Sequence, residues 1–121
     1  MPLLFKYICT TKLIANGIQI ANLSSASGTV FKAAASCHPA MVDPKDAENV
    51  TIPFALLPSK DEDKAAVEGW EKSIKTKKLV KWFPDHVHGW MAARSNLENE
   101  DEKKGYVEGY QILLEFFHEN L

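Results

Sequence analysis

Short apolar runs alternate along this chain with segments whose apolar residues recur at helical spacing. The apolar runs are residues 2–9, 30–37, 50–57 and 79–83. The helical patterns are residues 12–23, 64–75 and a last stretch that starts at 99–101. Short continuous apolar runs are typical of strands buried on both faces, and such strands occur in parallel sheets covered by helices. The pattern predicts an α/β fold with about four mostly parallel strands and helices packed on the faces of the sheet.

The run 30–37 contains three consecutive alanines, so a helix fits it as well as a strand, and both alternatives stay open. The final helix is expected to dock on the sheet through an apolar stripe. Its members are Tyr106, Val107, Tyr110, Ile112, Leu113, Phe116 and Phe117. A turn or short helix is expected at 43–46, where Pro44 can begin a helical turn.

Length and charge exclude several classes of protein. The 121 residues allow one domain, and 45% apolar with 25% charged residues is the composition of a globular chain. A net charge of -2 lacks the basic footprint of a nucleic-acid-binding domain. No apolar run reaches the roughly 20 residues that span a bilayer, and no secretion signal is recognisable. We therefore expect a cytoplasmic protein without nucleic-acid or membrane partners.

The cysteines point to neither a disulfide framework nor a zinc site. Cys9 and Cys37 are only two, and their spacing does not match zinc-ligand motifs. A metal site made of His86, His88 and Cys37 is a weaker alternative, because no matching pair of carboxylates accompanies the His-x-His sequence. We expect no metal and no cofactor.

Reactive residue types follow the predicted strands. In open parallel sheets, functional groups gather beyond the carboxyl ends of the strands. Cys9, His38, Asp61 and His88 all fall at that edge in the predicted order of elements. A histidine there can serve as a general base, because its ordinary pKa lies near neutral pH. The alternative is that the histidines only pack in the loops.

Four segments resemble the C-terminal half of the dienelactone hydrolase family, a branch of the α/β-hydrolases, and look closest to its fungal members. The segments are 31–39, ending in His-Pro; 52–61, ending in Ser-Lys-Asp; 82–90, containing His-Gly-Trp; and the last helix, 103–121. The resemblance implies that Asp61 is the acid of a catalytic triad and that His88 is its general base. It also implies a structural role for His86 and packing for His38.

One basic residue has a role by the same resemblance. Arg94 resembles a residue that in some members holds the carboxylate of the substrate. A plain surface arginine is the equally open alternative.

The chain departs from the family at the nucleophile. Such enzymes carry a Gly-x-Cys-x-Gly elbow, and this sequence has none. Residues 7–12 resemble an altered copy, in which Cys9 lies within one position of the expected nucleophile. Tyr7 and Thr11 stand two residues away instead of glycines. We expect one truncated α/β-hydrolase domain over residues 1–121. Within it, 1–23 form the altered nucleophile strand, turn and helix, and 30–121 form the half that bears the acid and the histidine.

Two functions remain open from the sequence. The first is a hydrolase of small lactones or carboxylic esters that uses Cys9, His88 and Asp61. The second is a non-catalytic fragment that keeps part of the fold and associates with itself through an open sheet edge next to residues 2–9.

Overall fold

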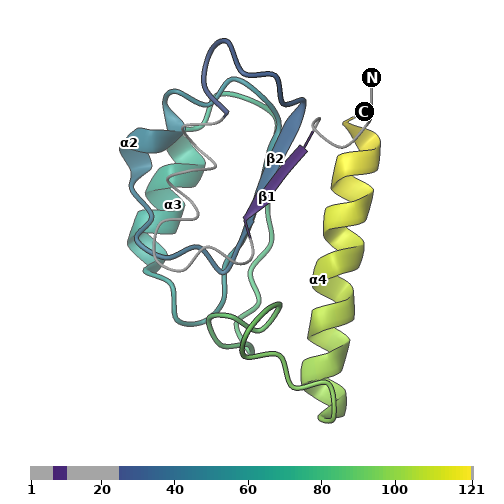
Figure 1. The fold of residues 1–121 in the computed structure, drawn as a ribbon. Coiled ribbons are helices and arrows are strands. Elements are labelled where there is room, and N and C mark those ends of the chain that lie inside the picture. The colour runs from purple at the N-terminus through teal and green to yellow at the C-terminus, as the bar shows by residue number, and fades with distance from the viewer. Residues whose placement is uncertain (1–6, 11–24, 121) are drawn as a thin grey trace.

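The computed structural model describes residues 7–10 and 25–120 (Figure 1). It confirms the predicted α/β class, with parallel strands and helices on both faces of a sheet. The helix expected at 12–23 and most of the altered nucleophile segment 1–23 lie outside the described residues.

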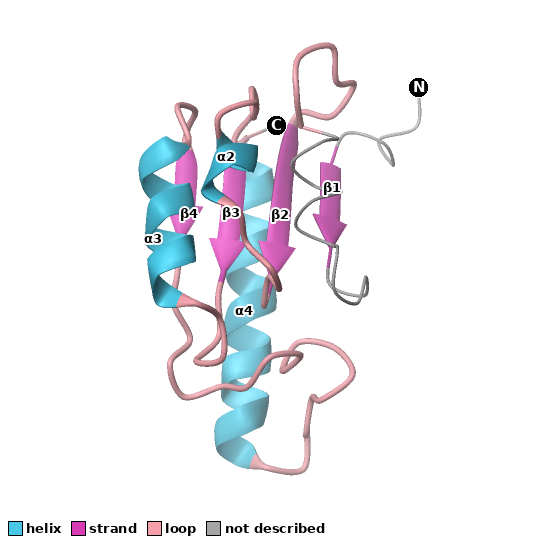
Figure 2. Cartoon of the chain, turned by 90° about the vertical axis from the view of Figure 1, so that its left-hand side faces the viewer, coloured by secondary structure: helices cyan, strands magenta, loops and turns pink. Residues whose placement is uncertain are grey.

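The sheet contains the strands β1 (Tyr7–Thr10), β2 (Ala33–Cys37), β3 (Phe54–Leu57) and β4 (Lys78–Val80). They lie side by side in chain order, and every neighbouring pair is parallel. One row of paired residues crosses the sheet, formed by Cys9, Ala35, Ala55 and Leu79. All strands therefore point to the same edge, from which the loops after β2, β3 and β4 emerge (Figure 2).

Helices cover the sheet in a layer on each face. The helices α2 (Pro44–Ala47) and α3 (Lys64–Ser73) pack together on one face, and α4 (Glu100–Glu119) lies on the other (Figure 1). Asp43 caps α2 by accepting the Lys45 N–H at 3.0 Å, which explains why the turn expected at 43–46 becomes a short helix. The start of α4 projects past the carboxyl edge of the sheet.

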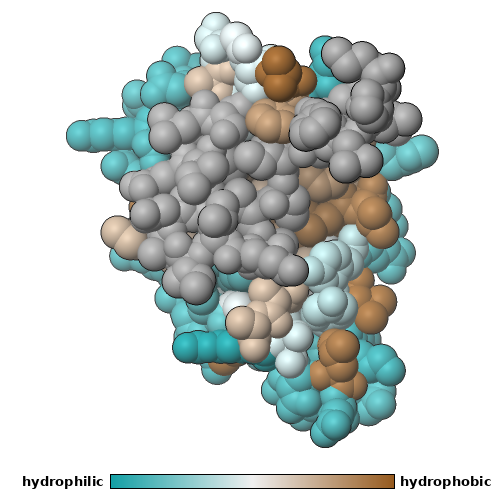
Figure 3. Space-filling model, in the orientation of Figure 1, coloured by the Kyte–Doolittle hydropathy of each residue, from teal (hydrophilic) through white to brown (hydrophobic). Residues whose placement is uncertain are grey.

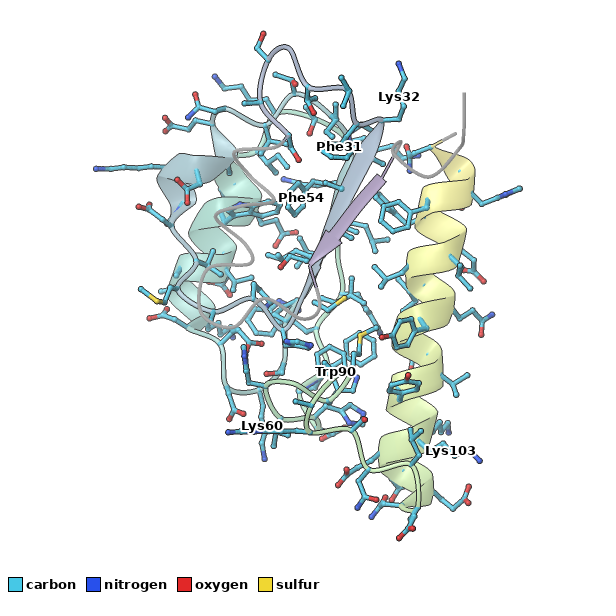
Figure 4. The ribbon with its side chains drawn as sticks, in the orientation of Figure 1. Phe31, Lys32, Phe54, Lys60, Trp90 and Lys103 are labelled. Carbon is cyan, nitrogen blue, oxygen red and sulfur yellow. The ribbon has the colours of Figure 1, made fainter. Side chains whose placement is uncertain are left out.

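Alternate residues of each strand enter the two halves of the core. Ala34, Phe54 and Leu56 pack with the α3 side, whose members include Val67 and Trp70. The residues on the α4 side are Ala33, Ala35, Cys37, Ala55, Leu57, Phe83, Trp90, Met91, Leu113 and Phe116. Figure 4 shows Phe54 on the side of α3 and Trp90 between the loops and α4. The period of two is that of a strand, so the helical alternative for 30–37 is wrong.

Three strands have other boundaries than the sequence predicted. β2 begins at Ala33 and not at residue 30. β3 begins at Phe54, after Pro53, whose carbonyl accepts the Ala34 N–H at 3.0 Å. β4 ends at Val80, and its residues are exposed or half-buried instead of buried. Beyond β4, the N–H groups of Lys81 and Phe83 still donate to the carbonyls of Leu56 and Pro58, at 3.0 and 2.8 Å.

The buried face of α4 also differs from the predicted stripe. Leu113 and Phe116 are buried as expected, but Val107 is 53% exposed. Gly105 and Gly109 are buried in its place. At these glycines the backbone of α4 lies against His86 and Met91 of the loop that follows β4, which leaves little room for a side chain.

On the face that Figure 3 draws, apolar side chains appear in separate groups on the side of α4. Hydrophilic side chains cover most of the end of the molecule from which α4 starts (Figure 3). Among the described residues, no helix combines the length and apolar character that crossing a membrane requires.

Candidate active site

Three loops meet beyond the carboxyl edge of the sheet. His38 directly follows β2, Asp61 and Glu62 lie between β3 and α3, and His88 lies in the long loop between β4 and α4. Cys9 differs from the prediction, because its backbone lies within β1 and pairs with Ala35. The edge therefore brings together the two histidines and the acidic loop, with Cys9 one residue before the last residue of its strand.

The loop after β3 is held by hydrogen bonds to its own buried serine. Ser59 is fully buried and pairs with Phe83 in an isolated parallel bridge. Its hydroxyl accepts the Asp61 N–H at 3.2 Å, and its own N–H donates to the Glu62 carboxylate. The Lys60 N–H donates to the carbonyl of His86 at 3.0 Å. These bonds fix the acidic loop against the loop that carries His88.

His88 contacts two consecutive acidic residues in different ways. Its backbone N–H donates to Oδ2 of Asp61 at 2.8 Å. Its ring atom Nδ1 lies 2.8 Å from Oε1 of Glu62. The sequence predicted that Asp61 would orient the imidazole. In the structure, Glu62 contacts the ring of His88, and Asp61 accepts the backbone N–H of the same histidine.

The Glu62–His88 pair has the geometry of an acid and a base in a hydrolytic triad. The Glu62 side chain is 3% exposed, while that of His88 is 37% exposed. An ionised carboxylate only accepts hydrogen bonds, so Nδ1 carries the hydrogen and Nε2 keeps a lone pair. Among the described residues, no hydrogen-bond partner meets Nε2. The pair can therefore take a proton at Nε2 while the carboxylate stabilises the charged ring.

His38 lies buried beside His88. It is 7% exposed, and the two ring centroids are 5.0 Å apart in an edge-on arrangement. Burial, reinforced by the charge of His88, lowers the pKa of His38 to about 4. Its φ of 39° is uncommon for a residue other than glycine, and Nε2 has no hydrogen-bond partner among the described residues. His38 is thus a neutral wall of the site near pH 7.

Aromatic packing supports the loop of His88 from behind. The rings of His86 and Trp90 stack with centroids 5.8 Å apart, and Phe83 lies 4.7 Å from Trp90. Trp90 donates from Nε1 to the Gly105 carbonyl of α4 at 3.4 Å. The expected structural role of His86 agrees with this packing. The loop therefore rests on α4, which orients His88 toward the acidic loop.

A pocket of about 390 Å³ opens next to the pair. His88, Glu62 and Asp61 line it, together with Asp63, the N-cap of α3, and Ala66 in its first turn. The segment after β2 also contributes to the lining. Its lining residues are Pro39, Ala40, Met41 and Val42. A small substrate in this pocket contacts the base directly.

Arg94, another predicted site residue, is not among the residues that line the pocket. Arg94 is exposed, and its aliphatic carbons lie over Gly89, 3.5 Å from the position of a Cβ there. The side chain of Cys9 lies outside the described part of the structure. The weaker metal hypothesis gains no support, because no group of three or more His, Cys, Asp or Glu in residues 7–10 and 25–120 has the arrangement of a metal site.

Sequence reasoning missed Glu62 although it found the right loop. Residues 61–63 are three acidic residues in a row, and their order does not say which side chain turns toward the imidazole. A usable signal was Ser59, because a small hydroxyl residue before a turn binds the following backbone N–H. The Ser59 N–H in turn donates to the carboxylate of Glu62, whose other oxygen contacts His88.

Two proteins of Schizosaccharomyces pombe are similar to this chain. An uncharacterised AIM2 family protein is 45% identical over 92 residues, which cover 72% of this chain and 37% of that protein. A second uncharacterised AIM2 family protein is 42% identical over 87 residues, or 68% of this chain and 35% of that protein. The chain thus spans little more than a third of the length of these curated relatives. No protein-family model and no solved structure matches it.

Proposed function

We propose that this chain carries the acid and base of a dienelactone hydrolase-type α/β-hydrolase, which opens small lactones or carboxylic esters. The observation that carries the proposal is the 2.8 Å contact between His88 Nδ1 and the buried Glu62 carboxylate. A base oriented in this way, beside a pocket at the carboxyl edge of a parallel sheet, is the arrangement that ester hydrolysis needs. The cytosol is the proposed compartment.

In the proposed reaction, His88 moves two protons in turn. Nε2 takes the proton of the nucleophile, whose sulfur or oxygen bonds to the carbonyl carbon, while Glu62 stabilises the resulting imidazolium. His88 then gives this proton to the alcohol oxygen as its bond to the carbonyl carbon breaks. The same nitrogen next takes a proton from water, whose oxygen bonds to the carbonyl carbon, and returns it to the nucleophile as the acid leaves. Asp61 keeps the ring in place through the His88 backbone.

Cys9 is the proposed nucleophile, on the resemblance to the family alone. Its backbone position in β1, next to β2, belongs to the strand that carries the elbow in that resemblance. Tyr7 and Thr11 stand where glycines would relieve the strained turn, so turnover by this chain is expected to be slow.

Hydrolysis of p-nitrophenyl acetate by four proteins tests the proposal. His88→Ala and Cys9→Ser should each lower the rate at least about 100-fold relative to the wild-type chain. Cys37→Ser is the matched control, because Cys37 is the other cysteine and lies in the core, 2% exposed. A wild-type rate that survives His88→Ala would contradict the hydrolase proposal. If His88→Ala abolishes hydrolysis but Cys9→Ser does not, the nucleophile is another residue.

The second candidate is a non-catalytic fragment that associates with itself through an open edge of the sheet. The missing elbow glycines favour it. β1 and β4 are the outer strands of the described sheet, and unpaired strand edges bind other strands. Sedimentation velocity decides this point: a concentration-dependent dimer supports self-association, and a monomer at all concentrations excludes it.

A further inference from the structure

The pocket beside His88 has an uneven distribution of charge. Three consecutive residues of its lining are carboxylates, Asp61, Glu62 and Asp63. Among the described residues that line it, none is a lysine or arginine. The segment from Pro39 to Val42, which also lines the pocket, is uncharged and contains the exposed side chain of Met41. A ligand therefore meets both apolar and acidic side chains.

The partners of the three carboxylates do not cancel their charge. Glu62 faces the ring of His88, which neutralises it only when the ring is protonated. Asp61 accepts a neutral backbone N–H. Asp63 accepts the Ala66 N–H at 2.9 Å as the cap of α3, where the helix supplies about half a positive charge. The net charge of the described lining residues therefore remains negative.

Basic residues near the pocket are directed elsewhere. The ammonium group of Lys64 lies 3.9 Å from Glu68 on the outer face of α3. Lys60 is exposed (Figure 4), and Arg94 lies over Gly89. None of the three lines the pocket. Within residues 7–10 and 25–120, a carboxylate on a substrate would therefore find three like charges and no cation in the lining.

We propose that this pocket takes neutral or positively charged small esters and disfavours substrates that carry a carboxylate. That the ligands are esters rests on the proposed hydrolase function. The charge selectivity rests on the lining of the pocket alone. It replaces the sequence-based expectation that Arg94 holds a substrate carboxylate. The physical reason is Coulomb repulsion at a partly buried site, which water and salt screen less than at an open surface.

The test compares three ligands of similar size and different charge: butyrate, butyramide and propyltrimethylammonium. Binding is followed through the imidazole carbon signals of His88 in NMR spectra, assigned with His88→Gln. Butyramide and the cation should shift these signals at concentrations about fivefold or more below those that butyrate needs. Equal or tighter binding of butyrate would overturn the proposal, and so would the failure of all three ligands to shift the signals.

A single neutralised charge provides the matched variant. Asp63→Asn keeps an oxygen that caps α3 and removes one negative charge from the lining. It should raise the affinity for butyrate relative to butyramide about threefold. Asp101→Asn is the control, because Asp101 is exposed in the first turn of α4 and does not line the pocket. The same change in both variants would mean that net charge, not the pocket, is responsible.

The binding test stays valid whether or not the chain turns over esters. Hydrolysis of p-nitrophenyl butyrate and of the mono-p-nitrophenyl ester of succinic acid is measured in parallel, with His88→Ala as the blank. Hydrolysis of the neutral ester alone supports both proposals. If neither ester is hydrolysed, the hydrolase proposal fails, and the ratio of butyramide to butyrate binding still decides the charge selectivity.

Discussion

The imidazole of His86 lies against the backbone of Gly105 in α4. A Cβ atom on residue 105 would overlap Nε2 and Cε1 of that ring and lie 2.8 Å from its Cδ2. Trp90 stacks on the same ring and donates to the Gly105 carbonyl. Gly105 therefore lets the loop of His88 pack directly on the helix. The contact is made by His86, two residues before the proposed base.

Gly105→Ala should destabilise the protein. Alanine favours the helix by about 1 kcal/mol over glycine, but overpacking against a ring typically costs about 1–3 kcal/mol. We expect a net loss of about 1–2 kcal/mol in the free energy of urea unfolding. Gly109→Ala is the comparison, because its Cβ would lie 2.6 Å from the sulfur of Met91, a flexible side chain that can move. Equal stability changes in both variants would argue against a tight seat for His86.

The double substitution His86→Ala with Gly105→Ala separates crowding from other effects. Removing the ring makes room for the new Cβ, so the additional cost of Gly105→Ala should largely disappear in the His86→Ala background. An unchanged cost in that background would show that the glycine is needed for another reason.

The two acidic residues at His88 should differ in their effect on hydrolysis. Glu62→Gln replaces a carboxylate by an amide that can hold Nδ1 in the wrong tautomer, and a loss of about 10³–10⁴-fold in kcat is expected from comparable triads. Asp61→Asn keeps an oxygen that accepts the His88 N–H, so a loss below about tenfold is expected. The measurement is the rate of p-nitrophenyl acetate hydrolysis. A larger loss for Asp61→Asn would return the acid role to Asp61.

The sequence could locate the site but not its internal contacts. The order of strands places the loops after β2, β3 and β4 at one edge, so the meeting of His38, the acidic loop and His88 follows from topology. Which carboxylate reaches the imidazole depends on the turn around Ser59, where backbone direction changes at each residue. The periodicity of apolar residues does not predict which way a side chain points in such a turn.

In the fold, too, the elements could be predicted from the sequence, but some of their local contacts could not. Apolar periodicity found both long helices, because their buried faces repeat with the helical turn. It failed at Val107, which is exposed, since Gly105 and Gly109 form the face of α4 that meets the loop. A glycine contributes nothing to an apolar stripe, so a close backbone contact is invisible to hydropathy. The end of β4 at Val80 was likewise hidden within a longer apolar run.

Asn99 should contribute to stability as the cap of α4. Its side-chain oxygen accepts the N–H groups of Asp101 and Glu102 at 3.0 and 3.1 Å. Asn99→Ala should lower the free energy of unfolding by about 1 kcal/mol, measured by urea denaturation. Asn99→Asp keeps the acceptor and is the control, with an expected change of a few tenths of a kcal/mol. Similar losses in both would mean that the cap bonds are not what stabilises this end.

His38 should make the protein lose stability as the pH falls from 6.5 to 4. Burial lowers the pKa of His38 from its ordinary 6.5 to about 4, so the unfolded chain binds this proton first. Stability therefore rises with pH inside that window and is unaffected by His38 above it. The depression corresponds to about 3 kcal/mol between the two ends of the window.

His38→Asn removes the titrating ring and suits the backbone, because asparagine tolerates the positive φ of 39° at this position. The free energy of urea unfolding is measured at pH 7.5 and pH 4.5 for both proteins. The wild type should lose about 2–3 kcal/mol more than the variant over this range. His88, whose charge helps to lower the pKa of His38, is present in both proteins. Parallel losses would show that His38 takes up its proton in the folded state as readily as in the unfolded chain, and that its burial beside His88 does not keep it neutral.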